Sequence, residues 1–274
     1  SSVGSKRVMT NVGSQRTQGV SGTVKYSPVY HPEERINWTL SASFKHQKAK
    51  YEDIGNSLDQ FNKENLNTSL VRYYDGGSPT ALWAVRSLGI NPSDGRELFL
   101  TKEGTYTFEY DTEDEVVVGN SEPKLEGVLG STLYWKGFSF SLYFRYSLGA
   151  DVFTEATYNK VENISLAGLK SNQDKRALHD RWQKPGDHAK FKGISLTETT
   201  PISSRFVLRE NYIKAESISI GYDFESQAVQ KLGIQSLRLQ ANTTDLFRIS
   251  SIKEERGIEY PFARSFSFSL SAMF

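Results

Sequence analysis

The side chains best suited to chemistry are aromatic and arginine residues in two long polar stretches of the chain. Aromatic faces and bidentate guanidinium groups bind sugars and peptide carboxylates well. Packing of a long loop on itself is the alternative use of such residues, and it is the commoner one. The candidate ligand contacts in these stretches are Tyr73, Tyr74, Trp83, Arg86, Arg181 and Trp182.

Catalytic and metal motifs are not found in the sequence. A Gly-rich phosphate loop, a G-x-S-x-G turn and an H-E-x-x-H pair are all missing, so neither catalytic residues nor a cofactor are predicted. His179, Asp180, Asp187 and His188 lie close together, but their spacing matches no standard metal site. The acidic run Asp111, Glu113, Asp114 and Glu115 lacks the glycine-punctuated spacing of a calcium loop, so we expect a solvated loop face there.

Composition narrows the classes of partner and fold. The 274 residues include 33 basic and 32 acidic side chains with a net charge of +1, so no footprint for nucleic acid is present. Aromatic residues reach 12% although the hydrophobic fraction is 37% and the mean hydropathy is -0.50, which is typical of alternating strands. No apolar run approaches the roughly 18 to 20 residues of a spanning helix, so any membrane role must fall to strands.

The last eleven residues carry the clearest strand pattern, an alternation of apolar residues with serines. A strand of a soluble sandwich would show the same alternation with its apolar face inward. A strand that ends on an aromatic residue is unusual at a soluble sheet edge, and it is the expected closing strand of an outer-membrane barrel. The candidate residues for barrel closure and assembly are Phe266, Phe268, Leu270 and Phe274.

A hairpin is predicted around the tight turn Lys136-Gly137. Beyond the turn, large apolar residues alternate with polar ones, and Arg145 lies among the polar set. In a barrel Arg145 would face the polar lumen while the apolar set would meet lipid. The apolar set is Phe138, Phe140, Leu142, Phe144 and Tyr146, and the polar set is Ser139, Ser141, Tyr143 and Arg145.

Further strands bring the total to about seven, each near the length that crosses a bilayer. Strong alternation predicts strands at 36–45 and 237–242, and weaker alternation predicts them at about 18–28 and 206–224. Short connections near 27–34, 136–137 and 225–231 contrast with long ones at about 50–121 and 151–204. Short turns on one rim and long loops on the other are the outer-membrane arrangement.

Four motifs follow one another along the chain, and together they resemble the SusC/RagA family of TonB-dependent outer-membrane transporters. The motifs are LWAVRSLGINP at 82–92 with GRELF at 95–99, YWKGFSF at 134–140, DRWQKPGD at 180–187, and DLF at 245–247 with YPFARSFS at 260–267. The resemblance implies an all-β fold, the C-terminal part of a roughly 22-stranded antiparallel transmembrane barrel with long extracellular loops.

The resemblance also implies a function and a set of partners. Residues 1–274 would supply about seven strands, and the plug and remaining strands would lie on an N-terminal remainder, because an open sheet cannot satisfy its edges in lipid. The implied activity is TonB-dependent import of an oligosaccharide or peptide across the outer membrane, assisted by a SusD-like surface lipoprotein. Arg145, Arg238 and Asn242 would line the path or contact the plug.

Two other functions fit parts of the sequence. A passive porin or structural barrel would share the strands, and a plug with a TonB box in the remainder would exclude it. A secreted soluble glycan-binding β-protein would share the aromatic loop residues. Extraction without detergent would favour that soluble protein over a membrane protein.

Overall fold

The computed structural model describes residues 11–195, 197–224, 229, 231, 233–253 and 263–274. The contacts divide the chain into two compact units. The first, here called the loop unit, comprises residues 1–18, 48–122 and 151–208. The second, the sheet unit, comprises residues 19–47, 123–150 and 209–274. The two connections predicted to be long therefore supply most of the loop unit.

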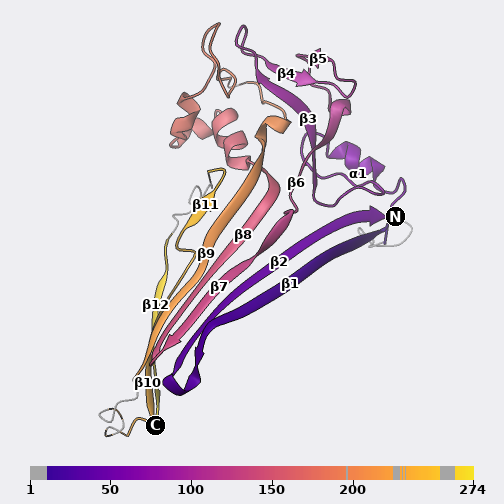
Figure 1. Ribbon diagram of the computed structural model, residues 1–274. Helices are drawn as coiled ribbons and strands as arrows, with labels where there is room; N and C mark the ends of the chain where they lie inside the picture. The colour runs from indigo at the N-terminus through magenta and orange to yellow at the C-terminus, as the bar shows by residue number, and fades with distance from the viewer. Residues whose placement is uncertain (1–10, 196, 225–228, 230, 232, 254–262) are drawn as a thin grey trace, which may run out of the picture. The chain divides into compact units, whose positions relative to one another are not determined.

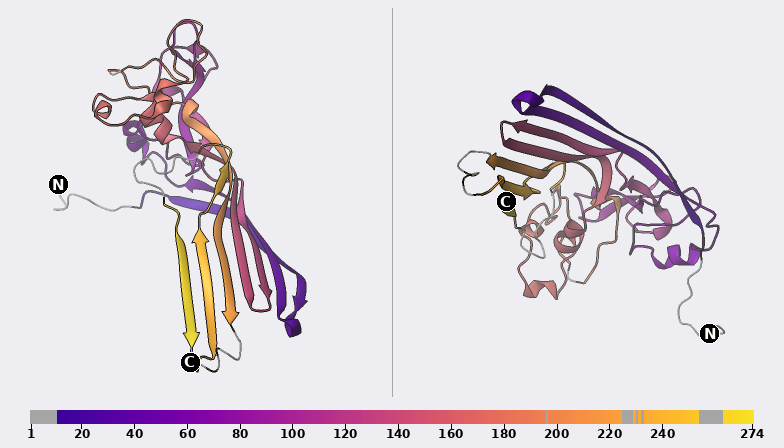
Figure 2. Two further views of the ribbon diagram at one scale, coloured as in Figure 1. Left: turned by 90° about the vertical axis from the view of Figure 1, so that its left-hand side faces the viewer. Right: turned by 90° about the horizontal axis from the view of Figure 1, so that it is seen from below.

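Long antiparallel strands run side by side in the sheet unit (Figures 1 and 2). Over the described residues this sheet has eight strands in the order β1-β2-β7-β8-β9-β10-β12, with β11 beside β9. All seven segments predicted to be strands contain one. The strands are β1 (Ser14–His31), β2 (Ile36–Glu52), β7 (Leu125–Trp135), β8 (Phe138–Phe153), β9 (Val207–Phe224), β10 (Ser236–Thr244), β11 (Arg248–Ser250) and β12 (Phe266–Met273).

The strand register aligns apolar residues on one face of the sheet. Leu270 of β12 lies opposite Leu239 of β10, which lies opposite Tyr222 of β9. The neighbouring row on the other face is polar, with Ser271 and Asp223 on either side of Arg238. Cross-strand neighbours of this kind are the unit of sheet stabilisation. The alternation seen in single strands is therefore continuous across three strands.

The predicted hairpin is confirmed. Lys136 and Gly137 both have positive φ, 48° and 96°, as a two-residue turn that matches the strand twist requires. Phe140 is aligned with Leu133 of β7, and Leu133 with Trp38 of β2. Arg145, in the polar set, forms an ion pair with Glu216 of β9 at 2.6 Å.

The apolar face of β12 is uncovered. Phe266, Phe268, Leu270 and Phe274 are between 61% and 79% exposed. Along the described strands the sheet order begins at β1 and ends at β12, so closure into a barrel is not seen. Figure 2 shows these two edge strands at opposite sides of the sheet, β1 in indigo and β12 in yellow.

The loop unit has a small sheet of its own, which the sequence did not predict. Its strands follow the order β5-β4-β3-β6. They are β3 (Ala81–Ile90), β4 (Glu97–Leu100), β5 (Tyr106–Thr107) and β6 (Glu115–Asn120). The buried residues around this sheet include Val85, Phe99, Val161 and Phe206.

Short helical segments complete the described part of the chain. The α-helix is α1 (Asp59–Glu64), and η3 (Thr157–Glu162) is a π-helical turn. The remaining 3-10 turns are η1 (Pro32–Glu34), η2 (Thr112–Asp114), η4 (Gly168–Lys170), η5 (Lys175–Leu178) and η6 (Ser204–Phe206). No helix among the described residues has the length and apolar character needed to cross a membrane.

Two features of the sequence fall wholly or partly outside the described residues. Residues 260–262 of the C-terminal motif lie outside them, and so does most of the short connection predicted at 225–231. The structure describes residues 263–267 of the motif, and it shows β9 paired with β10, the two strands that the connection joins.

Gly127 of β7 is a point of close approach between strands. A Cβ there would lie 1.9 Å from the Ser43 carbonyl oxygen of β2, where the Tyr146 hydroxyl of β8 donates a hydrogen bond at 2.9 Å. We predict that Gly127→Ala separates these strands and costs about 1–3 kcal/mol. Thr132→Ala, an exposed position on the same strand, should change stability by less than about 0.5 kcal/mol. Thermal unfolding of the full-length protein measures both, and equal melting temperatures would contradict the close approach.

Candidate ligand site in the loop unit

All six predicted ligand contacts lie in the loop unit, but the structure does not bring them together. Tyr74 and Trp83 lie side by side, with ring centroids 5.5 Å apart and ring planes tilted by 55°. Tyr73 is anchored elsewhere, against Tyr51 and Phe61 at 5.4 and 5.6 Å. Arg86, Arg181 and Trp182 occupy other places in the unit.

The Tyr74 and Trp83 rings form a wall of a cavity of about 580 Å³. The register of β3 against β6 shifts between Leu82 and Trp83, where Val118 is an extra residue in β6. The cavity is lined by Asp59, Asn62, Lys63, Leu66, Arg72, Tyr74, Trp83, Lys102, Thr112, Glu113 and Glu115.

Asn62 of α1 fixes the backbone that carries Tyr74. Its side-chain nitrogen donates to the Tyr73 carbonyl at 2.8 Å, and its side-chain oxygen accepts from the Tyr73 amide at 2.9 Å. Asn62 is buried, so these bonds are sheltered from water. The Tyr74 ring is thereby presented at the cavity from a backbone that is held on both sides.

A buried ion pair lies at the base of the cavity. Arg72 donates from Nε and Nη2 to the Glu115 carboxylate at 3.0 and 2.6 Å. Its remaining nitrogen, Nη1, donates to the carbonyls of Ser69 and Val71, both at 2.8 Å. Because every guanidinium nitrogen has a partner and the two charges cancel, the pair gives the cavity a rigid and neutral base.

Arg181 and Trp182 make hydrogen bonds within the loop unit and also line a second cavity of about 430 Å³, so their role in ligand contact stays a prediction. The buried Arg181 guanidinium donates to three carbonyls, those of Ala177, Lys192 and Glu162 at 2.5, 2.8 and 3.1 Å. Burial also lowers the pKa of Arg181. Trp182 donates to the Pro92 carbonyl at 2.9 Å and lies against Gly95, where a Cβ would be 2.5 Å from the ring.

Arg86 is less fully bonded. Its Nη2 atom donates to the Thr101 carbonyl, whereas its buried Nε atom has no hydrogen-bond partner within the described residues. Arg86 lies outside the set that lines the Tyr74 cavity. Its role in ligand contact stays a prediction.

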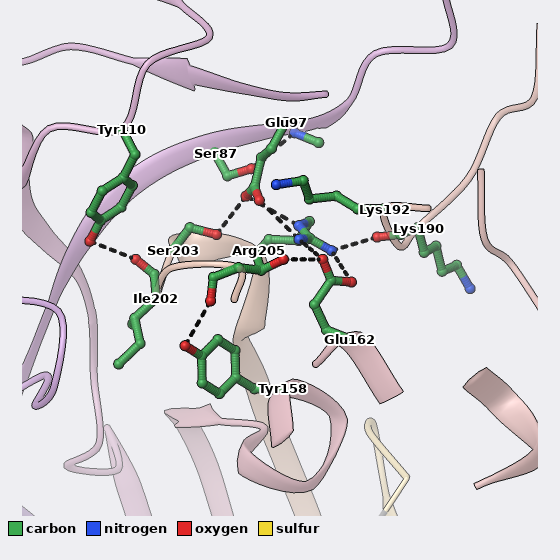
Figure 3. Close-up of polar contacts among 12 residues, drawn as sticks. Ser87, Glu97, Tyr110, Tyr158, Glu162, Lys190, Lys192, Ile202, Ser203 and Arg205 are labelled. Carbon is green, nitrogen blue, oxygen red and sulfur yellow. Dashed lines mark hydrogen bonds and ion pairs between the residues drawn. The ribbon is translucent and has the colours of Figure 1, made fainter. Parts of the chain in front are cut away.

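An ionic cluster that sequence reasoning missed lies around Arg205 (Figure 3). The Nη2 atom of Arg205 is 2.9 Å from a carboxylate oxygen of Glu97 and 2.9 Å from one of Glu162. Ser203 and Thr200 donate hydroxyl hydrogen bonds to these two carboxylates at 2.7 and 2.9 Å. Burial alone would lower the pKa of Arg205, but the hydrogen bonds to Glu162 and Glu97 outweigh it and raise the pKa.

One sequence feature relates to this cluster, although it can be recognised only once β4 is known. Glu97 lies two residues before Phe99 on β4, so both side chains lie on one face, and both are buried. A carboxylate on the buried face of a strand must find a partner. The identity of that partner could not be predicted, because Arg205 lies 108 residues further along the chain.

Several of the acidic residues considered for metal binding accept backbone hydrogen bonds, whereas Glu115 is buried in its ion pair with Arg72, so the expected solvated face is wrong for Glu115. No three His, Cys, Asp or Glu side chains form a metal-holding group in the part of the chain that is described. Asp111 accepts from the Glu113 amide at 2.8 Å, and Asp114 accepts from the Lys102 amide at 2.9 Å. Asp187 similarly accepts from the amides of Gln183 and Lys184 at 3.1 and 3.0 Å.

We predict that Arg205→Ala destabilises the loop unit by about 3–5 kcal/mol, because it leaves two buried carboxylates without their cation. Lys190→Ala is the matched control, since its exposed ammonium makes only a 3.5 Å contact with Asp180, worth less than about 1 kcal/mol. Hydrogen exchange of residues 151–206 in the full-length protein reports both changes. Equal protection in the two variants would show that the cluster does not hold the unit together.

Comparison with known proteins gives relatives in sequence. No family model matches the chain. It is 21% identical to TonB-dependent receptor P39 of Formosa agariphila, over 90% of this chain and 28% of the receptor. It is 25% identical to TonB-dependent receptor P3 of the same organism, over 63% of this chain and 16% of the receptor. The chain thus spans less than a third of the length of the curated relatives it matches.

Solved structures show the same fold. A chain of the RagAB peptide importer in the 'open-open' state matches with a TM-score of 0.73 and 16% identity, over 96% of this chain and 29% of that one. A chain of the RagAB peptide transporter matches with a TM-score of 0.68 and 18% identity, over 88% and 26%. The chain is therefore similar in sequence to TonB-dependent receptors, and its fold matches part of a chain of the RagAB importer.

Proposed function

We propose that the chain is part of an outer-membrane transporter that imports an oligosaccharide or peptide by a TonB-dependent mechanism. The observation that carries the proposal is the apolar face aligned across β9, β10 and β12 and left uncovered on β12. Similarity to TonB-dependent receptors and the fold shared with the RagAB peptide importer support it. As in those relatives, the function is transport and not catalysis.

The two faces of the sheet fit a membrane barrel. Its apolar face would meet lipid, and its polar face would line a lumen that tolerates charge. Arg238 lies 3.6 Å from Asp223 on that polar face, and Gln240 donates to Asn242 at 2.8 Å. Arg145, Arg238 and Asn242 would accordingly line the cargo path or contact a plug.

The open edges of the sheet require a partner. Backbone groups at an edge cost several kcal/mol each when they face lipid unpaired. The N-terminal remainder of the transporter would pair with β1 and β12 and supply the plug. In this arrangement β12 is the closing strand, and Phe266, Phe268, Leu270 and Phe274 form the lipid-facing surface that guides assembly.

The loop unit would lie on the extracellular side and take part in cargo capture with a SusD-like lipoprotein. Cargo would bind to preformed surfaces, and energy delivered by TonB through the remainder would displace the plug. Transport would then consist of binding followed by conformational release. No covalent step is required of this chain.

We predict that Phe140→Arg prevents barrel assembly, whereas Ser141→Asn is tolerated. Phe140 is aligned with Leu133 on the apolar face, and Ser141 with Thr132 on the polar face. A lipid-facing arginine near the bilayer centre costs about 2–4 kcal/mol, whereas the lumen accepts polar groups. Heat-modifiable gel mobility of the full-length transporter measures assembly. Equal assembly of the two variants would refute the assigned faces.

We predict that accumulation of cargo depends on TonB. Cells that produce the transporter would be given fluorescent neutral oligosaccharides and, separately, fluorescent peptides. Deleting TonB should abolish accumulation of whichever probe is imported, because the plug would no longer be displaced. Deleting an unrelated outer-membrane protein serves as the control. Uptake that persists without TonB would identify a passive porin instead.

A further inference from the structure

The cavity beside Tyr74 and Trp83 is built to accept a ligand without rearrangement. Asn62 holds the backbone of Tyr73 by two hydrogen bonds, and the amide of Trp83 donates to the Leu70 carbonyl at 2.8 Å. The buried Arg72–Glu115 pair fixes the base. Binding to such a site costs little conformational entropy, so most of the contact energy is retained as affinity.

The aromatic wall leaves ring surface available. At 5.5 Å and a tilt of 55°, the Tyr74 and Trp83 rings are not stacked on each other. Tyr74 remains 42% exposed. An aromatic face carries the negative part of the ring quadrupole and attracts weakly positive C–H groups. The apolar face of a pyranose ring presents such C–H groups.

The charges that line the cavity are balanced. Arg72 and Glu115 neutralise each other at the base. Around the rest of the cavity lie two cations, Lys63 and Lys102, and two anions, Asp59 and Glu113. Within the described residues these four form no ion pair, so two ammonium donors and two carboxylate acceptors are available to a ligand. Hydroxyl groups can use both kinds, because each donates and accepts.

We propose that this cavity is a subsite for a neutral saccharide segment of the cargo. The proposal rests on the import function above and adds the class of substrate. A volume of about 580 Å³ falls within the range of small-ligand sites. Balanced charge gives no net attraction for an acidic or sulfated glycan. The aromatic faces match the C–H face of a sugar ring, and the charged donors and acceptors match its hydroxyl groups.

A peptide ligand fits the cavity less well. Leu66 is the one aliphatic side chain among the residues that line the cavity, so an apolar peptide side chain would find little to pack against apart from the two rings.

The test uses the full-length transporter in detergent and isothermal titration with named probes. The neutral probes are maltotriose, cellotriose and xylotriose, the acidic probe is digalacturonate, and the peptide probe is tetra-alanine. The variants are Tyr74→Ala and, as control, Tyr106→Ala, which removes an exposed tyrosine of the same unit outside the cavity. Thermal unfolding establishes that both variants are folded.

We expect at least one neutral trisaccharide to bind, with affinity about tenfold weaker in Tyr74→Ala and changed less than about twofold in Tyr106→Ala. Binding of a neutral probe should also change little between low and high salt. Three results would overturn the subsite. They are equal saccharide affinity in both variants, no binding of any neutral probe, and a Tyr74-dependent affinity for only tetra-alanine or digalacturonate. Uptake that still depends on TonB in that case would leave the transport function standing.

Discussion

The strand register of the large sheet is the constraint on which the rest of the sheet unit depends. Side chains alternate with a period of two, so a slip of one residue would exchange the apolar and polar faces completely. Three local features hold the register. The Lys136-Gly137 turn sets the β7–β8 pairing. Because Gly127 has no side chain, the Tyr146 hydroxyl can donate a hydrogen bond to the Ser43 carbonyl. Arg145 of β8 forms an ion pair with Glu216 of β9.

The loop unit is organised differently, by buried charge. Its sheet is small, and its buried apolar residues alternate along the chain with buried polar ones such as Glu97, Glu162 and Ser203. Buried ion pairs contribute little net stability, because desolvation offsets the attraction. They do favour one arrangement of the chain, because any arrangement that separates the partners leaves a buried charge uncompensated. Arg205 and Arg72 therefore specify how segments distant in sequence meet within the unit, while apolar contacts supply most of the favourable free energy.

This difference explains what could be predicted from sequence. The long strands were found because their alternation is local, extending over eight or more residues in β12 and β10. Two strands of the loop unit were missed because β5 spans two residues and β4 four, too few for a period to appear. The longer strands β3 and β6 were missed because their sequences, ALWAVRSLGI and EVVVGN, do not alternate between apolar and polar residues. At the site, Tyr74 and Trp83 were both predicted from residue type. Their shared cavity was not, since it depends on an extra residue in β6 opposite β3 and on the Arg72–Glu115 pair, whose members are 43 residues apart.

Under the proposed function, the two kinds of organisation also separate two requirements of a transporter. Contact with lipid requires only that apolar side chains recur on one face of the sheet. Many sequences meet this requirement, so the sequence of the sheet can vary while its alternation persists. Ligand recognition asks for particular groups at fixed distances, which the loop unit obtains from buried hydrogen bonds such as those of Asn62 to Tyr73. Since these bonds lie within the loop unit, a substitution at Tyr74 or Lys102 alters the cavity without touching any residue of the strand register. Under the proposed function, cargo preference could therefore change through the loop unit while the sheet stays the same.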